Sequence, residues 1–277
     1  MAIAICLIAS ACSYAPGVGP RDAVGGDDDD AADASDAAST GLVSRSLVVR
    51  YFIDEAASGQ APSELADATA SPFPLQMHYT SALAFTEVAG QRGLRWTATG
   101  DDGRASAPLL LSKVASALNG AQHFTYELVV DIRDTMTGEC RLISIGNGTG
   151  TYGTAALVTS DLVSLRLHID TTNAYWNVAF GSGRVVLHAV VDTSQVTSSE
   201  RYRLYIDGVQ APRTGGTPPA QGAGLALQAA DFLAIGNIEG AGRSFGGEAY
   251  YAAIYSDALT DTEITTNAAR LRANDDH

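Results

Sequence analysis

The chain has few cysteines, and only one of them lies in the body of the protein. Of three cysteines in 277 residues, Cys6 and Cys12 fall in the N-terminal apolar run, which leaves Cys140 alone further along. Once that run is removed as a leader, Cys140 has no intrachain disulfide partner. An apolar core, rather than covalent cross-links, must therefore stabilise the fold.

Basic residues are also scarce. The chain contains 17 Lys and Arg against 31 Asp and Glu, for a net charge of −14, and no stripe of basic residues is present. Nucleic acids and anionic membranes attract cationic surfaces, so this balance argues against either one as a partner bound through a basic patch. Residues 13–44 hold seven aspartates against one arginine and supply nearly half of the acidity.

The apolar run of residues 1–12 is too short to cross a bilayer, because a transmembrane helix needs about 20 apolar residues. It ends in Ala9-Ser10-Ala11-Cys12, which resembles the lipobox of a bacterial lipoprotein signal. The resemblance implies a signal peptide cleaved before Cys12 and a lipidated Cys12, with membrane contact through the lipid anchor only. Ser13 is not an aspartate-type retention signal, so we expect an outer-membrane lipoprotein of the cell envelope, facing periplasm or exterior. A plain secretory signal and an uncleaved apolar end are the alternatives.

Residues 13–44 consist mainly of Ala, Asp, Ser and Gly, with almost no large side chains. Such a segment buries too little apolar surface to offset the entropy of ordering, and its aspartates repel one another. We therefore expect a disordered acidic linker that tethers a single folded domain, residues 45–277. A calcium loop at Asp27–Asp30 is the alternative, but this run lacks the Gly and the bidentate Glu of such loops.

Alternating apolar and polar residues predict strands in the body of the chain. Phe124–Arg133 and Val163–Asp170 alternate with period two, which is typical of half-buried strands. Val185–Val191 is apolar on both parities except at His188, as in a central strand, and we expect His188 to be buried and hydrogen-bonded. The Asp207-Gly208 dipeptide predicts a tight type I′ hairpin. No internal repeat is apparent, which argues against a solenoid or a propeller.

Helix signals are few. Thr260-Asp261-Thr262-Glu263 is a capping box, and three apolar residues on one face follow it: Ile264, Ala268 and Leu271. Ser112–Leu118 predicts one more short turn, ended by Asn119-Gly120. These patterns predict an all-β fold of antiparallel strands with a short C-terminal helix.

The last part of the chain carries a family resemblance. The hairpin Leu204–Val209, the strand Phe232–Gly236, the step Phe245-Gly246-Gly247 and the block Ala258–Ile264 resemble the closing strands of laminin-G-like, concanavalin-A-like jelly rolls. The resemblance covers roughly residues 45–272. The resemblance implies an antiparallel β-sandwich of the jelly-roll type. Lectins, adhesion modules and glycosidases share this sandwich, so the resemblance defines the fold better than the function.

The resemblance also bears on calcium. In members that hold a structural calcium ion, an aspartate of the last strand joins acidic residues from the first loops. This chain has Ala249-Tyr250-Tyr251 there, with an acidic residue displaced by two positions. Calcium is therefore a candidate cofactor only, and turn capping by surface carboxylates is the alternative. The candidate ligands are Asp54, Glu55, Asp67 and Glu248.

A sugar platform is one hypothesis for the ligand site. Tyr175 and Trp176, flanked by Asn173 and Asn177, could stack against the apolar faces of pyranose rings while amides bind hydroxyls. Adjacent strand residues point to opposite faces, so only one of the two aromatics can serve a given surface, and core packing of Trp176 is the alternative. Asn147 and Asn237, next to glycines, are further candidates, with a turn role as the alternative.

Motifs for catalysis are weak. Gly148–Gly153 matches G-x-G-x-x-G and Gly242–Gly246 matches G-x-S-x-G, but both lack the strand-to-helix setting that their chemistry needs. Glu127 and Asp131 lie four residues apart, which is about 13 Å along a strand and too far for a glycosidase pair, so both are expected on an exposed face. The sequence thus favours a non-enzymatic recognition module for a glycan or a surface protein. A structural envelope protein without a ligand and a glycoside hydrolase are the alternatives.

Overall fold

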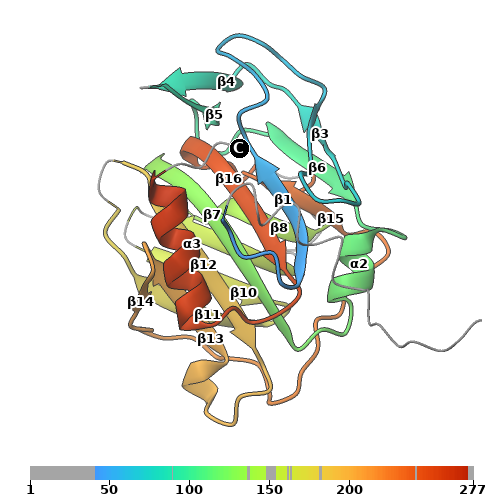
Figure 1. Cartoon of the computed structure of the whole chain (residues 1–277), viewed down its shortest axis with the longest axis vertical. Helices are drawn as coiled ribbons and strands as arrows, with labels where there is room; N and C mark the ends of the chain where they lie inside the picture. The colour runs from blue at the N-terminus through green and yellow to red at the C-terminus, as the bar shows by residue number, and fades with distance from the viewer. Residues whose placement is uncertain are drawn as a thin grey trace, which may run out of the picture.

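The computed structural model describes residues 41–273, apart from residues 89, 136–137, 148–153, 161, 163, 181–182 and 241. Cys12, nearly all of the predicted linker and the Gly148–Gly153 motif lie outside the described residues. Two antiparallel sheets pack face to face, and one helix lies across the outside of the first sheet (Figure 1). Of the helices in the described part, none is both long enough and apolar enough to span a membrane.

The first sheet has eight strands, and the long strand β7 runs through its middle. β1 (Leu47–Phe52) pairs with the C-terminal part of β16 (Gly246–Tyr255), whereas β5 (Gln91–Trp96) pairs with the N-terminal part of β16. The other seven strands follow one another in the order β14 (Val209–Ala211), β13 (Tyr202–Ile206), β12 (Val185–Asp192), β7 (His123–Asp134), β16 (Gly246–Tyr255), β5 (Gln91–Trp96) and β4 (Leu83–Val88).

The second sheet also has eight strands and ends at β11 on one side. Its order is β11 (Thr172–Asn177), β10 (Ser164–Ile169), β9 (Ala155–Ser160), β8 (Cys140–Gly146), β15 (Phe232–Ile235), β6 (Arg104–Pro108), β3 (Leu75–His78) and β2 (Glu64–Leu65). Every pairing in both sheets is antiparallel, as the alternation and the hairpin signal predict.

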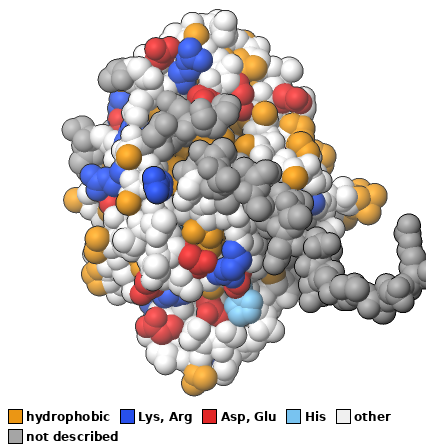
Figure 2. Space-filling model, viewed as in Figure 1, with side chains coloured by type: hydrophobic (Ala, Val, Ile, Leu, Met, Phe, Trp, Pro, Cys, Tyr) orange, Lys and Arg blue, Asp and Glu red, His pale blue; other side chains and the backbone are white. Residues whose placement is uncertain are grey.

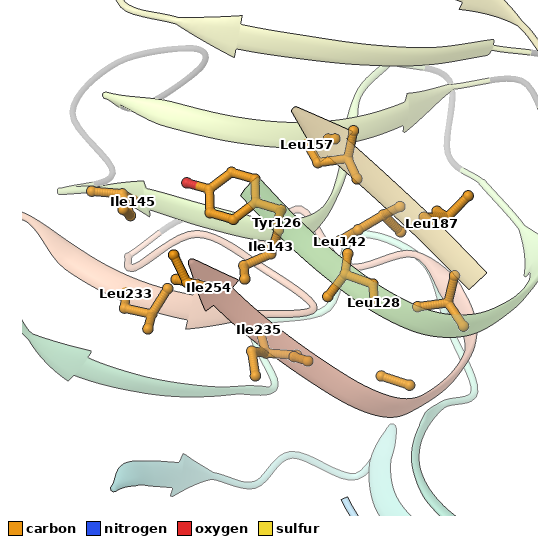
Figure 3. Packing of buried hydrophobic residues seen from close by; sticks show 14 of the residues in the cluster. Tyr126, Leu128, Leu142, Ile143, Ile145, Leu157, Leu187, Leu233, Ile235 and Ile254 are labelled. Atoms are coloured by element: carbon orange, nitrogen blue, oxygen red, sulfur yellow. The ribbon is translucent and has the colours of Figure 1, made fainter. Parts of the chain in front are cut away.

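The main core lies between the two sheets, where apolar side chains from facing strands interdigitate. Figure 3 shows Tyr126 and Leu128 of β7 packed near Ile143 and Leu157 of the second sheet. The prediction of a central strand at Val185–Val191 is confirmed, because β12 pairs with β7 on one side and β13 on the other. The predicted hairpin is confirmed as well, with positive φ angles at Asp207 and Gly208.

The prediction of a half-buried strand at Phe124–Arg133 is wrong on one face. Glu127 and Thr125 are fully buried although they point away from the main core, and Asp131 is nearly so. The reason is a second apolar cluster on the outside of the first sheet, where Val129 of β7 and Val190 of β12 pack under the C-terminal helix. A strand covered on both faces accepts polar residues only if each finds a partner.

The described helices begin where the sequence signals place them. Ser112 accepts the Ala115 amide at the start of α2 (Lys113–Leu118), and the chain turns at Asn119. In α3 (Asp261–Ala273) the capping box is formed: Thr260 N donates to Glu263 Oε2 at 2.8 Å, and Glu263 N donates to Thr260 Oγ1 at 3.3 Å. One turn of 3₁₀ helix, η1 (Ser198–Glu200), precedes β13.

The capping box predicts that the stability of the fold depends on pH through Glu263. Hydrogen bonds from Arg45 and Thr260 lower the pKa of Glu263 from 4.5 to about 2. A carboxylate with a lowered folded pKa contributes its full stability above the ordinary pKa and loses it as the pH falls from about 4.5 towards 2. We expect Glu263→Gln to cost about 1 kcal/mol at pH 7. Chemical denaturation at pH 7 and pH 2 should show this difference shrinking at the lower pH, and a difference independent of pH would contradict the assignment.

Under α3 a buried carboxylate joins the helix to the sheet. Glu127 of β7 accepts hydrogen bonds from His188 Nε2 at 2.7 Å, Asn267 Nδ2 at 2.7 Å, and the hydroxyls of Tyr251 and Tyr255 at 2.9 Å. All five side chains are fully buried. Burial opposes ionisation, but the hydrogen bonds from His188 and Asn267 and the nearby arginine charge hold the pKa of Glu127 below its ordinary value. The expectation of a buried, hydrogen-bonded His188 is confirmed.

Candidate functional site

Strand β11, at the edge of the second sheet, carries three of the residues proposed for ligand binding. Trp176 points inward, is 1% exposed and belongs to the main core, whereas Asn173 and Tyr175 point outward. The guanidinium of Arg166, on the neighbouring strand β10, lies over the Tyr175 ring at 4.8 Å from its centroid. The two adjacent aromatics therefore serve opposite faces, so a platform made of both does not form.

The open edge of β11 is covered by the segment that follows β14. Tyr175 N donates to Gly215 O at 3.1 Å, and Thr214 N donates to Tyr175 O at 2.8 Å. The side-chain oxygen of Asn173 accepts the Thr217 amide at 3.2 Å, and the backbone amide of Asn173 donates to Thr217 O. Asn173 thus anchors this segment against the sheet, and the unpaired strand edge, which could otherwise recruit other chains, is protected.

The other two asparagines lie elsewhere in the second sheet. Asn237 follows β15, four strands away from β11, which is about 19 Å. It is fully buried: its Nδ2 donates to Asp101 O at 2.6 Å, and its Oδ1 accepts the amides of Ile238 and Arg243. Asn147 is half-buried at the end of β8. The structure does not gather the five candidates at one place, and Asn237 closes a turn.

The proposed calcium ligands do not assemble into a metal site in the described part of the chain. Asp67 accepts the backbone amides of Arg50, Thr69 and Phe73, and Lys113 Nζ lies 2.7 Å from its Oδ2. Glu55 Oε1 accepts the Ala66 amide. Asp54 directly precedes Glu55, after β1. In the part of the chain that the structure describes, no three His, Cys, Asp or Glu side chains are arranged to hold a metal ion.

Glu248 takes part in a carboxylate pair that sequence reasoning missed. The register of β16 on β7 sets Glu248 directly opposite Asp131, a cross-strand position where Cβ atoms lie about 5 Å apart. Arg133 contacts both acids, at 3.0 Å from Glu248 and 2.9 Å from Asp131, and Arg95 lies 3.3 Å from Glu248. Burial, with a smaller effect from Asp131, raises the pKa of Glu248 against the two arginines. Both carboxyls are covered and ion-paired, which is an arrangement suited to holding strands together.

A groove lies beside β11, between the edges of the two sheets, and we call it the edge groove. Its volume is about 400 Å³. Two aromatic residues from facing sheets, Trp176 and Tyr202, lie along it, and the Tyr202 hydroxyl is 2.7 Å from Thr172 Oγ1. The full lining is Trp176, Ser199, Glu200, Tyr202, Arg203, Gln210, Ala211, Pro212 and Arg213.

The lining of the edge groove combines hydrogen-bond donors and acceptors with aromatic carbon. Arg213 Nη1 donates to Ser198 O at 3.2 Å, which leaves most of its guanidinium hydrogens for another acceptor. Arg203 is held by the Tyr205 hydroxyl at 3.0 Å and Asp261 at 3.4 Å. Most residues that line the edge groove come from η1, β13 and the chain after β14. No single stretch of sequence therefore predicts the site.

A smaller pocket of about 140 Å³ opens at one end of the sandwich, between the ends of β7, β10 and β12. Its lining is mostly apolar or small, with Asp170 as the charged member; the other polar groups are threonines. Burial, with a smaller effect from Asp231, raises the pKa of Asp170. With fewer polar groups and a third of the volume, this pocket is less suited to a sugar than the edge groove is.

Two packed antiparallel sheets with a jelly-roll connectivity are typical of concanavalin-A-like sandwich domains. The family model described as the Concanavalin A-like lectin/glucanases superfamily matches residues 101–265. The chain belongs to this family. None of the curated proteins matches the sequence significantly.

Solved structures agree on the fold. A Trypanosoma rangeli sialidase in complex with the inhibitor DANA is 17% identical, with a TM-score of 0.57, over 83% of this chain and 34% of the sialidase. The binding domain of botulinum neurotoxin DC, in complex with rat synaptotagmin II, is 10% identical with a TM-score of 0.57, over 82% of this chain and 52% of that one. Domain 4 of an extracellular arabinanase from Geobacillus stearothermophilus, in complex with arabinotriose, is 15% identical with a TM-score of 0.54, over 80% of this chain and 98% of that domain.

The chain spans about a third of the length of the sialidases that it matches. At these identities the likeness shows the shared fold, and function must be argued from the residues of this chain.

Proposed function

We propose that this chain is a non-enzymatic recognition module that binds a carbohydrate or a surface protein partner in the edge groove. The lining of the groove carries the proposal. Arg213, Gln210 and Glu200 offer donors and acceptors for sugar hydroxyls, and the buried rings of Trp176 and Tyr202, each 1% exposed, line the groove from the core side. Among the proteins of similar fold, an arabinanase domain was solved with arabinotriose and a toxin domain with a protein, which supports a binding role.

A recognition role is favoured over hydrolysis by the state of the carboxylate pair. Asp131 and Glu248 lie opposite each other on adjacent strands, but Glu248 is fully buried and both acids are engaged by arginines. A substrate would have to displace these ion pairs to reach either carboxyl. The edge groove, by contrast, is lined by a single carboxylate, that of Glu200, rather than by a pair.

The module would be displayed at the cell envelope. The lipobox-like sequence that ends at Cys12 supports a lipid anchor, and the acidic composition of residues 13–44 supports a linker to the domain that follows. Mass spectrometry of the mature protein tests this part: an N-terminal cysteine with a diacylglyceryl thioether and an acylated amine is expected. An unmodified Cys12 would contradict the anchor and leave the recognition proposal to its own test.

A glycan array probed with the full chain, with and without chelator, tests recognition. Binding to a restricted set of glycans is the expected result, and since no metal cluster forms in the described part of the chain, chelator should leave the signal unchanged. A blank array would contradict the carbohydrate proposal and favour a structural envelope protein without a glycan ligand.

Two variants locate the site. Arg213→Ala removes a cationic donor and should weaken binding of the strongest array glycan at least about tenfold. Ala211→Trp fills the edge groove and should abolish binding. Arg92→Ala is the matched control, since Arg92 lies on β5, far from β11 in the sandwich, and pairs with exposed Glu87. Equal binding by all three variants in a titration would place the site elsewhere.

A further inference from the structure

The turn between β6 and α2 presents two large apolar side chains to solvent. Leu111 is 95% exposed and Leu110 is 61% exposed, whereas the preceding Leu109 is fully buried. Figure 2 shows hydrophobic side chains protruding at the edge of the molecule, where Figure 1 places this turn beside α2. Single exposed apolar residues are ordinary, but two adjacent leucines at the tip of a turn are not. We call Leu110 and Leu111 the leucine tip.

The backbone of the leucine tip is unfavourable for leucine. Leu109 O accepts the Ser112 amide, which makes Leu109–Ser112 a four-residue turn with Leu111 in its third position. Leu111 has a φ of 59°, in the left-handed region that glycine or asparagine occupies without strain. Neither packing nor backbone geometry explains a leucine here, so its exposed side chain needs another explanation.

The surroundings of the leucine tip are uncharged. A shallow groove of about 340 Å³ runs along it, and none of its residues carries a charge, in a chain with a net charge of −14. The nearest cation along the chain, Lys113, is turned inward and pairs with Asp67. The groove is lined by Leu109, Leu110, Leu111, Ala115, Ser116, Asn119, Leu227, Gln228 and Ala229.

We infer that the leucine tip inserts into the surface of a lipid bilayer. The inference rests on the lipid anchor of the proposed function: residues 13–40 connect Cys12 to the described domain, and a random coil of that length spans about 30 Å. A domain held so close to a membrane meets it at high effective concentration, so two leucines suffice where free binding would be weak. An uncharged tip also avoids the repulsion that the acidic surface would meet at anionic lipids.

The test couples the full chain to vesicles chemically. In a Cys6→Ser background, Cys12 is joined to a maleimide lipid in phosphatidylethanolamine vesicles with or without phosphatidylglycerol, and amide hydrogen exchange is compared with the same chain joined to a soluble maleimide polymer. We expect exchange at residues 110–112 to slow at least tenfold on both kinds of vesicle. The segments around Val196 and Val209, which are 80% and 71% exposed, should not change.

The variant Leu110→Ser with Leu111→Gly completes the test. It should lose the protection while its denaturation midpoint does not fall, since glycine suits the turn. Unchanged exchange on vesicles, equal slowing at Val196 and Val209, or protection that persists in the variant would each overturn the inference. Protection that follows protein concentration instead of lipid would assign the tip to a second copy of the chain and would overturn it too. The chemical coupling of Cys12 to the vesicle lipid takes the place of the lipid anchor formed in cells. A chain that is not lipidated in cells can therefore still be tested for insertion of the leucine tip, and the two failures are distinguishable.

Discussion

Replacing Gly236 by alanine is expected to lower the free energy of unfolding by more than about 4 kcal/mol. Gly236 follows β15 with a φ of 76°, and a Cβ at this position would lie 2.0 Å from Cζ2 of Trp96. Trp96 cannot move aside, because it is buried in the core, its Nε1 donates to Gly103 O at 2.8 Å and Phe245 packs against its ring. Chemical denaturation followed by circular dichroism measures the loss.

Gly222 provides the matched control. Its φ of 75° is nearly the same, but a Cβ there would meet nothing within 4 Å. Gly222→Ala should therefore cost about 1 kcal/mol, the strain of a left-handed alanine alone. The difference between the two variants measures the clash with Trp96. Equal losses would mean that the close approach of the turn to the tryptophan is absent in solution.

Replacing Glu127 by alanine is expected to cost about 3–5 kcal/mol. Its carboxylate accepts hydrogen bonds from His188, Asn267, Tyr251 and Tyr255. The substitution removes this acceptor while the four donors stay buried. Denaturation at pH 7 measures the loss. Because the pKa of Glu127 is lowered in the folded state, its contribution is present above about pH 4.5 and disappears as the pH falls further. The difference in the free energy of unfolding between wild type and variant should therefore shrink as the pH falls below about 4.5.

Glu64 serves as the control for Glu127, since it is an exposed glutamate on the short strand β2. Glu64→Ala should change the stability by no more than about 0.5 kcal/mol. A loss below about 1 kcal/mol for Glu127→Ala would contradict the view that this buried network fastens α3 to the sheet.

The sequence predicts those features of the fold that depend on neighbouring residues. The Asp207-Gly208 hairpin, the capping box at Thr260 and the central strand at Val185–Val191 are all local patterns, and the structure has each of them. The expected exposure of Glu127 is wrong because α3, which covers that part of the sheet, comes from the far end of the chain. Asp131 instead pairs with Arg133 and accepts the Gly183 amide. Alternation shows that two faces differ, but it does not show what covers them.

The site depends on register and assembly, which the sequence does not display. Glu248 and Asp131 become neighbours only through the pairing of β16 with β7. Sequence spacing offered only Glu127 with Asp131, a pair rejected as too far apart, and so did not bring Glu248 and Asp131 together. The edge groove likewise joins Trp176 of β11 to Arg213, which follows β14. Of the residues predicted to bind a ligand, Trp176 lines the edge groove. The alternation of side chains along β11 turns Trp176 inward, towards this groove.

The central claim is that the edge groove is the recognition surface, and ligand mapping by NMR tests it most directly. The strongest glycan from the array is titrated into the ¹⁵N-labelled full chain, and the chemical shifts of the backbone amides and of the tryptophan indole N–H groups are followed. The account predicts that the largest shifts fall on the Trp176 indole and on residues 199–213. Shifts gathered on the outer face around Arg166 and Tyr175, or none at saturating glycan, would contradict it.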